Sequence, residues 1–362
     1  MNKSHFSYYS ILFIIFLLIV ILNLHEHLNY GDDLNIKSNN DINQDNKKEL
    51  YEYYSKRTEE IINSNGIEEA LKYINETVRK NTKYGLTHMI MHIVGHEAYH
   101  KTANLKKALS YLPDCSFTEE CFWDFDGYQH GVFQAYFRNN KNIKPVSTLM
   151  QQACSEYYNT TLLTSDNLSK RLISTQCFHA LGHALMDFNN NDVFKSLSDC
   201  EMLPDDVMKD RCYYGVFMEN SYLQVPFYEP NAPRPLITNG TIIPICEKVK
   251  ESQKFTCSNF VAWTMLLKGE DINRSLSLCF DLEEKYRRPC ISLAAKHFIP
   301  NIFKDDFPRM VDICKNLGHY EETCIGAVAE GIRQGGTGPQ YKNFPFCDIV
   351  NPKFKKSCLN SV

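Results

Sequence analysis

Ten cysteines in the C-terminal half of the chain form five sequential pairs. The two members of a pair are separated by 10 to 12 residues, and the first members of successive pairs are 46, 33, 35 and 33 residues apart. The pairs are Cys200 and Cys212, Cys246 and Cys257, Cys279 and Cys290, Cys314 and Cys324, and Cys347 and Cys358. A period near 34 residues is typical of stacked helical hairpins, so one local unit is expected to repeat along the chain.

Residues 307–336 illustrate the predicted unit. An amphipathic helix ends near Cys314, a polar turn follows, and a second helix begins near Cys324 and ends at Gly335 and Gly336. A disulfide across this turn would close a loop of about a dozen residues and stabilise the hairpin by about 2 to 3 kcal/mol. We therefore predict an all-α fold, a right-handed superhelical solenoid of α-hairpins cross-linked by disulfides.

This period and its paired cysteines resemble the disulfide-bridged α-hairpin repeats of the Sel1-like and tetratricopeptide class over residues 67–362. The resemblance implies a solenoid of helical hairpins. It implies no activity, because the signature residues of those repeats do not match this chain.

The N-terminus is strongly apolar. Ile11 to Leu22 contains only apolar residues, and the stretch extends to about Phe6 and Leu24, which is long enough to span a bilayer. No small-residue cleavage pattern follows it, and Lys3 precedes it. We predict a cytoplasmic tail over residues 1–5 and a transmembrane signal anchor over 6–24, with the body outside the cell membrane. The alternative is a cleaved signal peptide and a secreted protein.

The cysteine content agrees with an oxidising compartment. Fourteen cysteines, an even number, follow the export segment, and no CxxC motif indicates a zinc site. Four of them precede the regular pairs, and their pairing stays open: Cys115, Cys121, Cys154 and Cys177. Charge is nearly balanced, with 39 Lys and Arg against 43 Asp and Glu and no basic run, so we expect no nucleic-acid partner.

Composition divides the rest of the chain. Residues 25–48 are predicted to form a flexible linker because they are polar and rich in Asn and Asp. Residues 49–199 are predicted to form N-terminal helical repeats, and 200–362 the repeats with paired cysteines. The five prolines between Gln224 and Pro244 interrupt the period and predict a long loop, with short extended pieces around residues 236–245.

Seven of the twelve histidines lie between residues 88 and 183, and five of them follow the repeat. The pattern H-x-x-G-H occurs at 92–96 and again at 179–183, and His130 aligns with the first histidine of both. Equivalent positions on neighbouring hairpins would lie side by side, and adjacent glycines would let the helices approach closely. These glycines are Gly95, Gly131 and Gly182. The predicted metal ligands are His92, His96, His130, His179 and His183.

Neutral imidazole binds transition metals, so the predicted cofactor is a zinc, copper or iron ion. Two carboxylates near the cluster, Glu97 and Glu219, are the candidate catalytic bases. A base beside a metal-bound water would permit hydrolysis, and a redox metal would permit electron transfer. The sequence does not decide whether the protein is an enzyme.

Two other functions and a structural interpretation compete with the metal site. Residues 96–100 read HEAYH and match the HExxH motif of zinc peptidases, but no extended motif supplies a third ligand. A disulfide-rich solenoid also suits an extracytoplasmic scaffold that binds a protein partner on its concave face. The histidines could instead form a polar structural network. His88 and His100 fall outside the repeated pattern and are not predicted as ligands.

Overall fold

The computed structural model describes residues 44–78, 84–111, 119–142, 146–157, 168–225, 228, 241–298, 307–335 and 346–361. The chain divides into two units, Met1–Asp45 and Asn46–Val362. The predicted tail and anchor lie outside the described residues. Among the helices that are described, none is long and apolar enough to cross a membrane.

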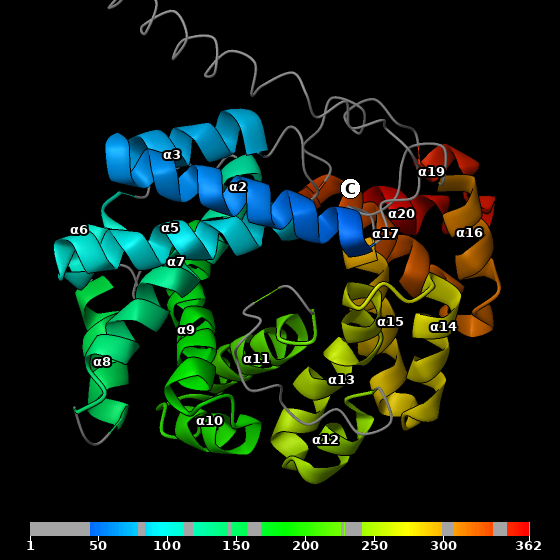
Figure 1. Cartoon of the computed structure of the whole chain (residues 1–362). Helices are drawn as coiled ribbons and strands as arrows, with labels where there is room; N and C mark the ends of the chain where they lie inside the picture. The colour runs from blue at the N-terminus through cyan, green and yellow to red at the C-terminus, as the bar shows by residue number, and fades with distance from the viewer. Residues whose placement is uncertain are drawn as a thin grey trace, which may run out of the picture. The chain divides into compact units, whose positions relative to one another are not determined.

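The described residues contain helices and no β-strand, which confirms the predicted all-α fold. Long helices alternate with shorter helical segments along most of the chain (Figure 1). The long helices are α2 (Gln44–Ser64), α5 (Tyr84–Thr102), α7 (Glu119–Asn139), α9 (Leu168–Phe188), α11 (Asp206–Tyr222), α13 (Glu251–Leu267), α15 (Glu284–Phe298) and α17 (Glu321–Gly335). The shorter segments are α3 (Ile67–Tyr73), η1 (Ile74–Val78), α6 (Leu105–Leu109), α8 (Val146–Tyr157), α10 (Val193–Cys200), α12 (Ile243–Lys248), α14 (Ile272–Ser277), η2 (Leu278–Asp281), α16 (Phe307–Lys315), η5 (Gly318–Tyr320), α19 (Phe346–Ile349), η6 (Pro352–Phe354) and α20 (Lys355–Ser361).

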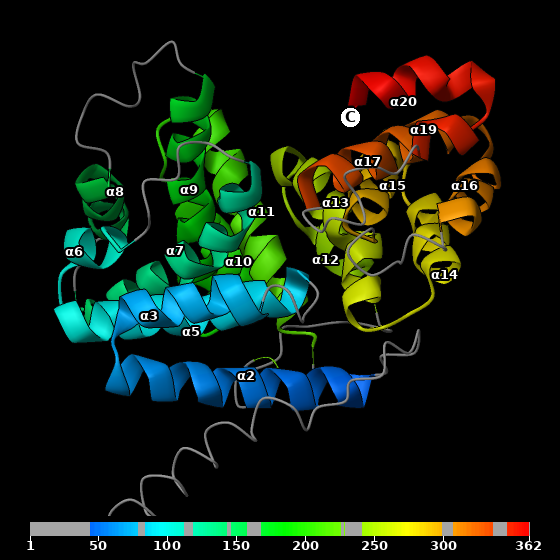
Figure 2. The same ribbon diagram turned by 90° about the horizontal axis from the view of Figure 1, so that it is seen from above.

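Within the second unit, the long helices pack in chain order. Each helix from α5 to α15 contacts the next long helix, and α17 contacts α20 (Figures 1 and 2). Helix α17 also contacts α7, so the later helices reach the helix that carries His130. Packing of neighbours in sequence is expected of stacked hairpins. The superhelical arrangement itself stays a prediction.

Among the described residues, six disulfides cross-link this packing, and they include all five predicted pairs. Each predicted pair joins a short helical segment to the next α-helix along the chain, with Cα atoms 5.4 to 5.7 Å apart. The sixth disulfide joins Cys154 of α8 to Cys177 of α9, a pairing that the sequence left open. Cys115 lies outside the described residues, and the side chain of Cys121 is not described. This number of disulfides indicates an oxidising, extracytoplasmic environment.

The proline-rich segment between Gln224 and Pro244 is helical at its C-terminal end, where an extended conformation is predicted. Helix α11 ends at Tyr222, in agreement with a loop that begins near Gln224. Helix α12 begins at Ile243, so the extended conformation predicted for 243–245 is wrong. Pro244 fits in the first turn because the N–H groups there have no partner within the helix.

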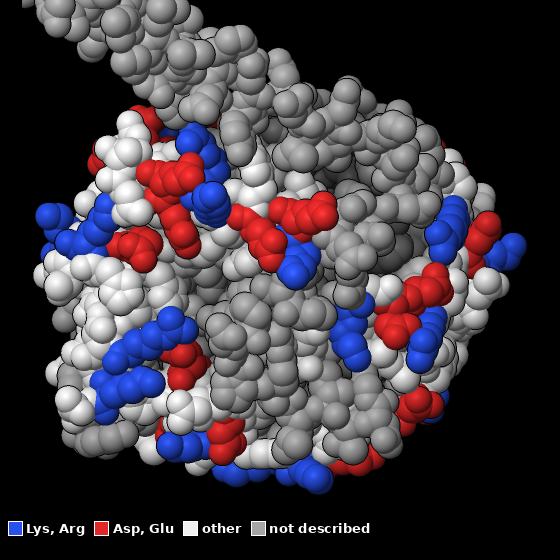
Figure 3. All heavy atoms as spheres, in the orientation of Figure 1, with Lys and Arg blue, Asp and Glu red and all other residues white. Residues whose placement is uncertain are grey.

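Charged side chains are interspersed on the described surface. Figure 3 shows small groups of basic and acidic side chains next to one another on this face. Among the described ion pairs, Lys250 lies 3.3 Å from Glu201 and Lys285 lies 2.7 Å from Glu251.

Candidate metal centre

Helix α7 packs against both α5 and α9, and glycines allow the close approach. A Cβ atom at Gly131 would overlap the carbonyl oxygen of His92 in α5, and one at Gly95 would overlap the backbone of α7 at Tyr128. Likewise, a Cβ atom at Gly182 would overlap the backbone of α11. The role predicted for the three glycines is therefore confirmed, because any larger residue would force the helices apart.

The crossing of α5 and α7 is repeated by α9 and α11. Gly131 packs at the carbonyl of His92, and Gly215 packs in the same way at the carbonyl of His179. This equivalence confirms the alignment of His92 with His179, and with it the repeat of the H-x-x-G-H pattern. Gly215 and Gly127, which packs at the carbonyl of His88, make further close contacts that the sequence analysis did not identify.

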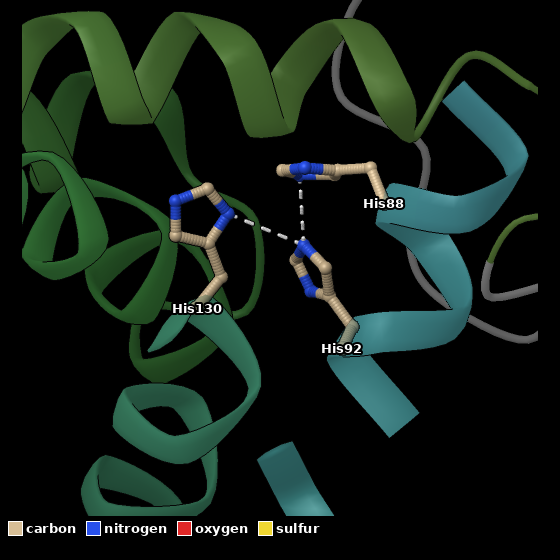
Figure 4. Close-up of side chains that lie close together, drawn as sticks. All are labelled: His88, His92 and His130. Atoms are coloured by element: carbon tan, nitrogen blue, oxygen red, sulfur yellow. Dashed lines mark hydrogen bonds between the residues drawn. The ribbon is translucent and has the colours of Figure 1, made fainter. Parts of the chain in front are cut away.

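Three imidazoles from α5 and α7 form the first histidine triad, His88, His92 and His130. The Nε2 atom of His92 lies 3.3 Å from Nε2 of His88 and 3.3 Å from Nδ1 of His130. In Figure 4 the two dashed contacts meet at the same nitrogen of His92, which the His130 ring approaches with a nitrogen and which lies below the face of the His88 ring. One ligand atom from each residue lies within 4.8 Å of the others, so one metal ion could contact all three.

The second histidine triad is formed by His130, His179 and His183. The Nε2 atoms of His179 and His183, one turn apart on α9, are 3.1 Å from each other. The His130 ring is stacked on the His183 ring, with centroids 3.7 Å apart, and its centroid is 4.9 Å from that of His179. The two triads therefore share His130, and each contains two histidines from a helix that flanks α7.

All five imidazoles are buried. His88, His130 and His183 have no exposed surface, and His92 and His179 are 5% and 6% exposed. Burial lowers the pKa of His183 to about 3, and burial together with a smaller effect of the His183 imidazole lowers that of His88 to about 3. Burial is also the main reason why the pKa values of the other three lie well below 6.5. The rings are therefore neutral near pH 7, which is the form that binds metal ions.

Glu219 of α11, one of the predicted catalytic residues, lies at the edge of this cluster. Its Oε2 atom is 2.6 Å from Nδ1 of His183, and Oε1 accepts a hydrogen bond from the hydroxyl of Tyr228 at 3.3 Å. The same hydroxyl lies 3.3 Å from Nδ1 of His92. Burial, with a smaller contribution from Asp187, raises the pKa of Glu219 to about 8. Glu219 thus holds His183 by the nitrogen that faces away from His179.

His96 lies next to the cluster but belongs to neither triad. Its Nε2 atom is 3.2 Å from the side-chain oxygen of Gln134, which lies at the same distance from Nδ1 of His92. Nδ1 of His96 lies 3.4 Å from the guanidinium of Arg138. His96 is thus placed to hold the side chain of Gln134 in position, and Gln134 in turn holds the orientation of the His92 ring.

The HEAYH segment does not form a metal-binding group among the described residues. The rings of His96 and His100 are 6.2 Å apart, and His100 is exposed. Glu97, the other predicted catalytic residue, is half-buried on the same helix and belongs to neither triad. No third ligand joins these residues in the part of the chain that the structure describes.

Two residues of the cluster were missed by sequence reasoning. His88 has no counterpart in the repeat, so the repeat does not predict it as a ligand, although its spacing of four residues from His92 is a sufficient signal. The structure buries it against Tyr222, whose ring is stacked on it with centroids 5.3 Å apart. Tyr228 lies in the proline-rich segment, where no periodic pattern predicts which side chain turns inward.

Comparisons with models of known protein families, with curated proteins and with solved structures find no match. The geometry of the cluster and the chemistry of its side chains are therefore the basis for a function.

Proposed function

We propose that this protein binds a transition-metal ion in its buried histidine cluster. The observation that carries the proposal is the position of the Nε2 atom of His92. Two other ring nitrogens, from His88 and His130, lie 3.3 Å from it. Ligand nitrogens at 2.0 to 2.1 Å from a tetrahedral zinc ion would be about 3.3 Å apart, which matches these two separations.

Hydrogen bonding between the rings accounts less well for this contact. A neutral imidazole nitrogen carries either one N–H or one lone pair in the plane of its ring. Nε2 of His92 can therefore make one well-aligned hydrogen bond, whereas two ring nitrogens approach it. A metal ion among the three nitrogens would accept a lone pair from each of them.

The donor set favours zinc or copper over iron. Both triads consist of imidazoles alone, and neither includes a carboxylate or thiolate from the described residues. Non-haem iron centres commonly use two histidines and one carboxylate, whereas zinc and copper accept three imidazoles. Glu219 would act on the ion indirectly, by accepting the Nδ1 proton of His183 and orienting its ring.

Burial of the ligands favours a site for an ion over a site for a large substrate. The five histidines are at most 6% exposed, so a polypeptide could not reach them in this conformation. Peptide hydrolysis by HEAYH is not favoured either, because His96 is engaged with Gln134 and His100 is exposed. We therefore propose metal binding as the function and assign no catalytic reaction.

The cellular setting is part of the same proposal. The disulfides require an oxidising compartment, and the apolar segment 6–24 would hold the body at the outer face of the membrane. Metal bound there would be exchanged with the extracytoplasmic side.

Metal analysis of the full chain, purified in detergent with its disulfides formed, tests this function. We expect at least one equivalent of zinc or copper, either retained or bound on titration of the stripped protein. Replacing His130 with Ala should abolish most of the binding, whereas His100→Ala is the matched control and should keep it. Less than a tenth of an equivalent in the wild-type protein, with none bound on titration, would contradict the proposal and leave the scaffold interpretation.

A further inference from the structure

We propose that the cluster holds two metal ions, one in each triad, and that His130 is a ligand to both. This inference rests on the proposed metal binding and specifies the number and placement of the ions. The described residues form two groups of side chains that could each hold a metal ion, and no such group unites all five histidines. A single ion could satisfy only one of these groups.

The helix order explains why there are two sites and one shared ligand. Helix α7 contacts α5 on one side and α9 on the other. Each flanking helix contributes two histidines separated by four residues, which therefore lie on one face of that helix. The pairs are His88 with His92 and His179 with His183, and His130 of the central helix belongs to both groups.

The orientation of the His130 ring suits a shared ligand. Its Nδ1 atom faces Nε2 of His92 at 3.3 Å, and its other nitrogen points away from both His88 and His92 (Figure 4). Each nitrogen of an imidazole offers one lone pair, so two ions require both nitrogens. Neutral His130 carries one N–H, and that proton would leave to solvent when the second ion binds. The ring would then be an imidazolate with one negative charge.

Each triad also has its own residues to hold its rings in place. Gln134 lies 3.2 Å from Nδ1 of His92 in the first triad. In the second, Gln176 lies 3.3 Å from Nδ1 of His179, and Glu219 lies 2.6 Å from Nδ1 of His183. These contacts leave the Nε2 atoms of all three histidines directed toward the ion sites. Separate supporting residues are expected where two ions are bound at two places.

Charge is consistent with occupancy by two ions. Glu219 directly contacts His183, but its pKa of about 8 leaves it mainly protonated near pH 7 in the metal-free protein. An imidazolate at His130 would add one negative charge between the ions. That charge would offset part of the cost of burying two cations among these side chains.

Stoichiometry of the metal-stripped full chain, titrated with Zn(II), tests the inference. We expect two equivalents for the wild-type protein and for His100→Ala. Replacing His88 with Ala should leave one equivalent, held by the second triad, and His179→Ala should leave one equivalent in the first. His130→Ala should weaken both sites. Circular dichroism would establish that each variant keeps its helical content.

A second measurement uses Cu(II). Two copper ions joined by the His130 imidazolate would be magnetically coupled, so the electron paramagnetic resonance signal should weaken as the second equivalent is added. In His88→Ala, the single copper should give an uncoupled signal of full intensity.

The outcomes separate the inference from the function on which it rests. One equivalent in the wild-type protein, with uncoupled copper, would overturn the two-ion centre and leave the proposed metal binding intact. Two equivalents with an uncoupled copper signal would overturn the shared His130 ligand. No binding at all would overturn both proposals.

Discussion

At the scale of the residue, Glu219 is unusual because an acidic side chain is buried in contact with a histidine of the cluster. It is 1% exposed, and the group closest to it is the imidazole of His183. A carboxylate that accepts the Nδ1 proton of a ligating histidine fixes the tautomer and orientation of the ring and makes the other nitrogen a better donor. The structure gives Glu219 this position and leaves Glu97 outside both triads.

Replacing Glu219 with Gln should weaken metal binding about 10- to 100-fold, because the amide keeps the shape of the side chain but cannot become the carboxylate that accepts the Nδ1 proton of a metal-bound His183. Competition with a chromophoric chelator would measure the affinity of each variant. Glu97→Gln is the matched control and should bind metal as the wild-type protein does. Equal metal affinities for the two variants would show that Glu219 does not contribute to metal binding.

A pH dependence of stability follows from the buried imidazoles. The pKa values of His88 and His183 lie near 6.5 in the unfolded chain and are about 3 in the folded protein. Between these values the unfolded state binds more protons, so the free energy of unfolding decreases as the pH falls from about 6.5 toward about 3. Each histidine contributes a slope of about 1.4 kcal/mol per pH unit in this window.

Urea unfolding of the metal-free protein between pH 7 and pH 4, in the presence of a chelator, would measure this slope. Replacing His88 with Gln should reduce the slope by about 1.4 kcal/mol per pH unit, which is the contribution of one proton. The same slope in the variant and the wild-type protein would show that His88 does not stay neutral when the chain folds.

At the scale of the element, the site depends on how closely α7 approaches its two neighbours. Gly131 follows His130 directly and packs on the carbonyl of His92, so the contact that brings the helices together also sets the position of the shared histidine. The period of the cysteine pairs predicted the hairpins, and the glycines predicted the close approach. The distance between the two helices is set by contacts between residues about 40 positions apart, such as Gly131 and His92.

Replacing Gly131 with Ala should destabilise the protein by about 1 to 3 kcal/mol, because the added methyl group overlaps backbone that cannot move aside without separating α5 from α7. The same separation should weaken metal binding. Urea denaturation and metal titration would measure the two effects. Asn139→Ala, at an exposed position near the end of α7, is the control and should change stability by less than about 0.5 kcal/mol. A stable Gly131→Ala variant with unchanged metal binding would contradict this account of the helix contact.

At the scale of the whole molecule, serial packing links the site to the rest of the body. Helix α7 contacts α5, α9 and α17, so the helix that carries the shared histidine is in contact with early and late parts of the chain. An ion bound at His130 would therefore oppose separation of helices that lie far apart in sequence.

Metal loading should raise the stability of the whole body. Free metal at 100 times its dissociation constant stabilises a folded protein by about 2.7 kcal/mol per site, provided that the unfolded chain does not bind it. Calorimetry of the loaded and stripped protein should show a higher melting temperature for the loaded form, and the difference should disappear in His130→Ala. An increase of the same size in that variant would place the stabilising ion elsewhere.

The sequence by itself determined the features that depend on residues close together in the chain. Cysteines 10 to 12 residues apart can pair across one turn, and histidines four residues apart share a helix face, so the five disulfides and the H-x-x-G-H repeat were predictable. Only the tertiary structure decided which side chains meet. It joined His88 to the cluster, placed His96 against Gln134, paired Cys154 with Cys177, and brought Tyr228 to His92 across 136 residues. These outcomes depend on helix packing and side-chain rotation, which local spacing does not specify.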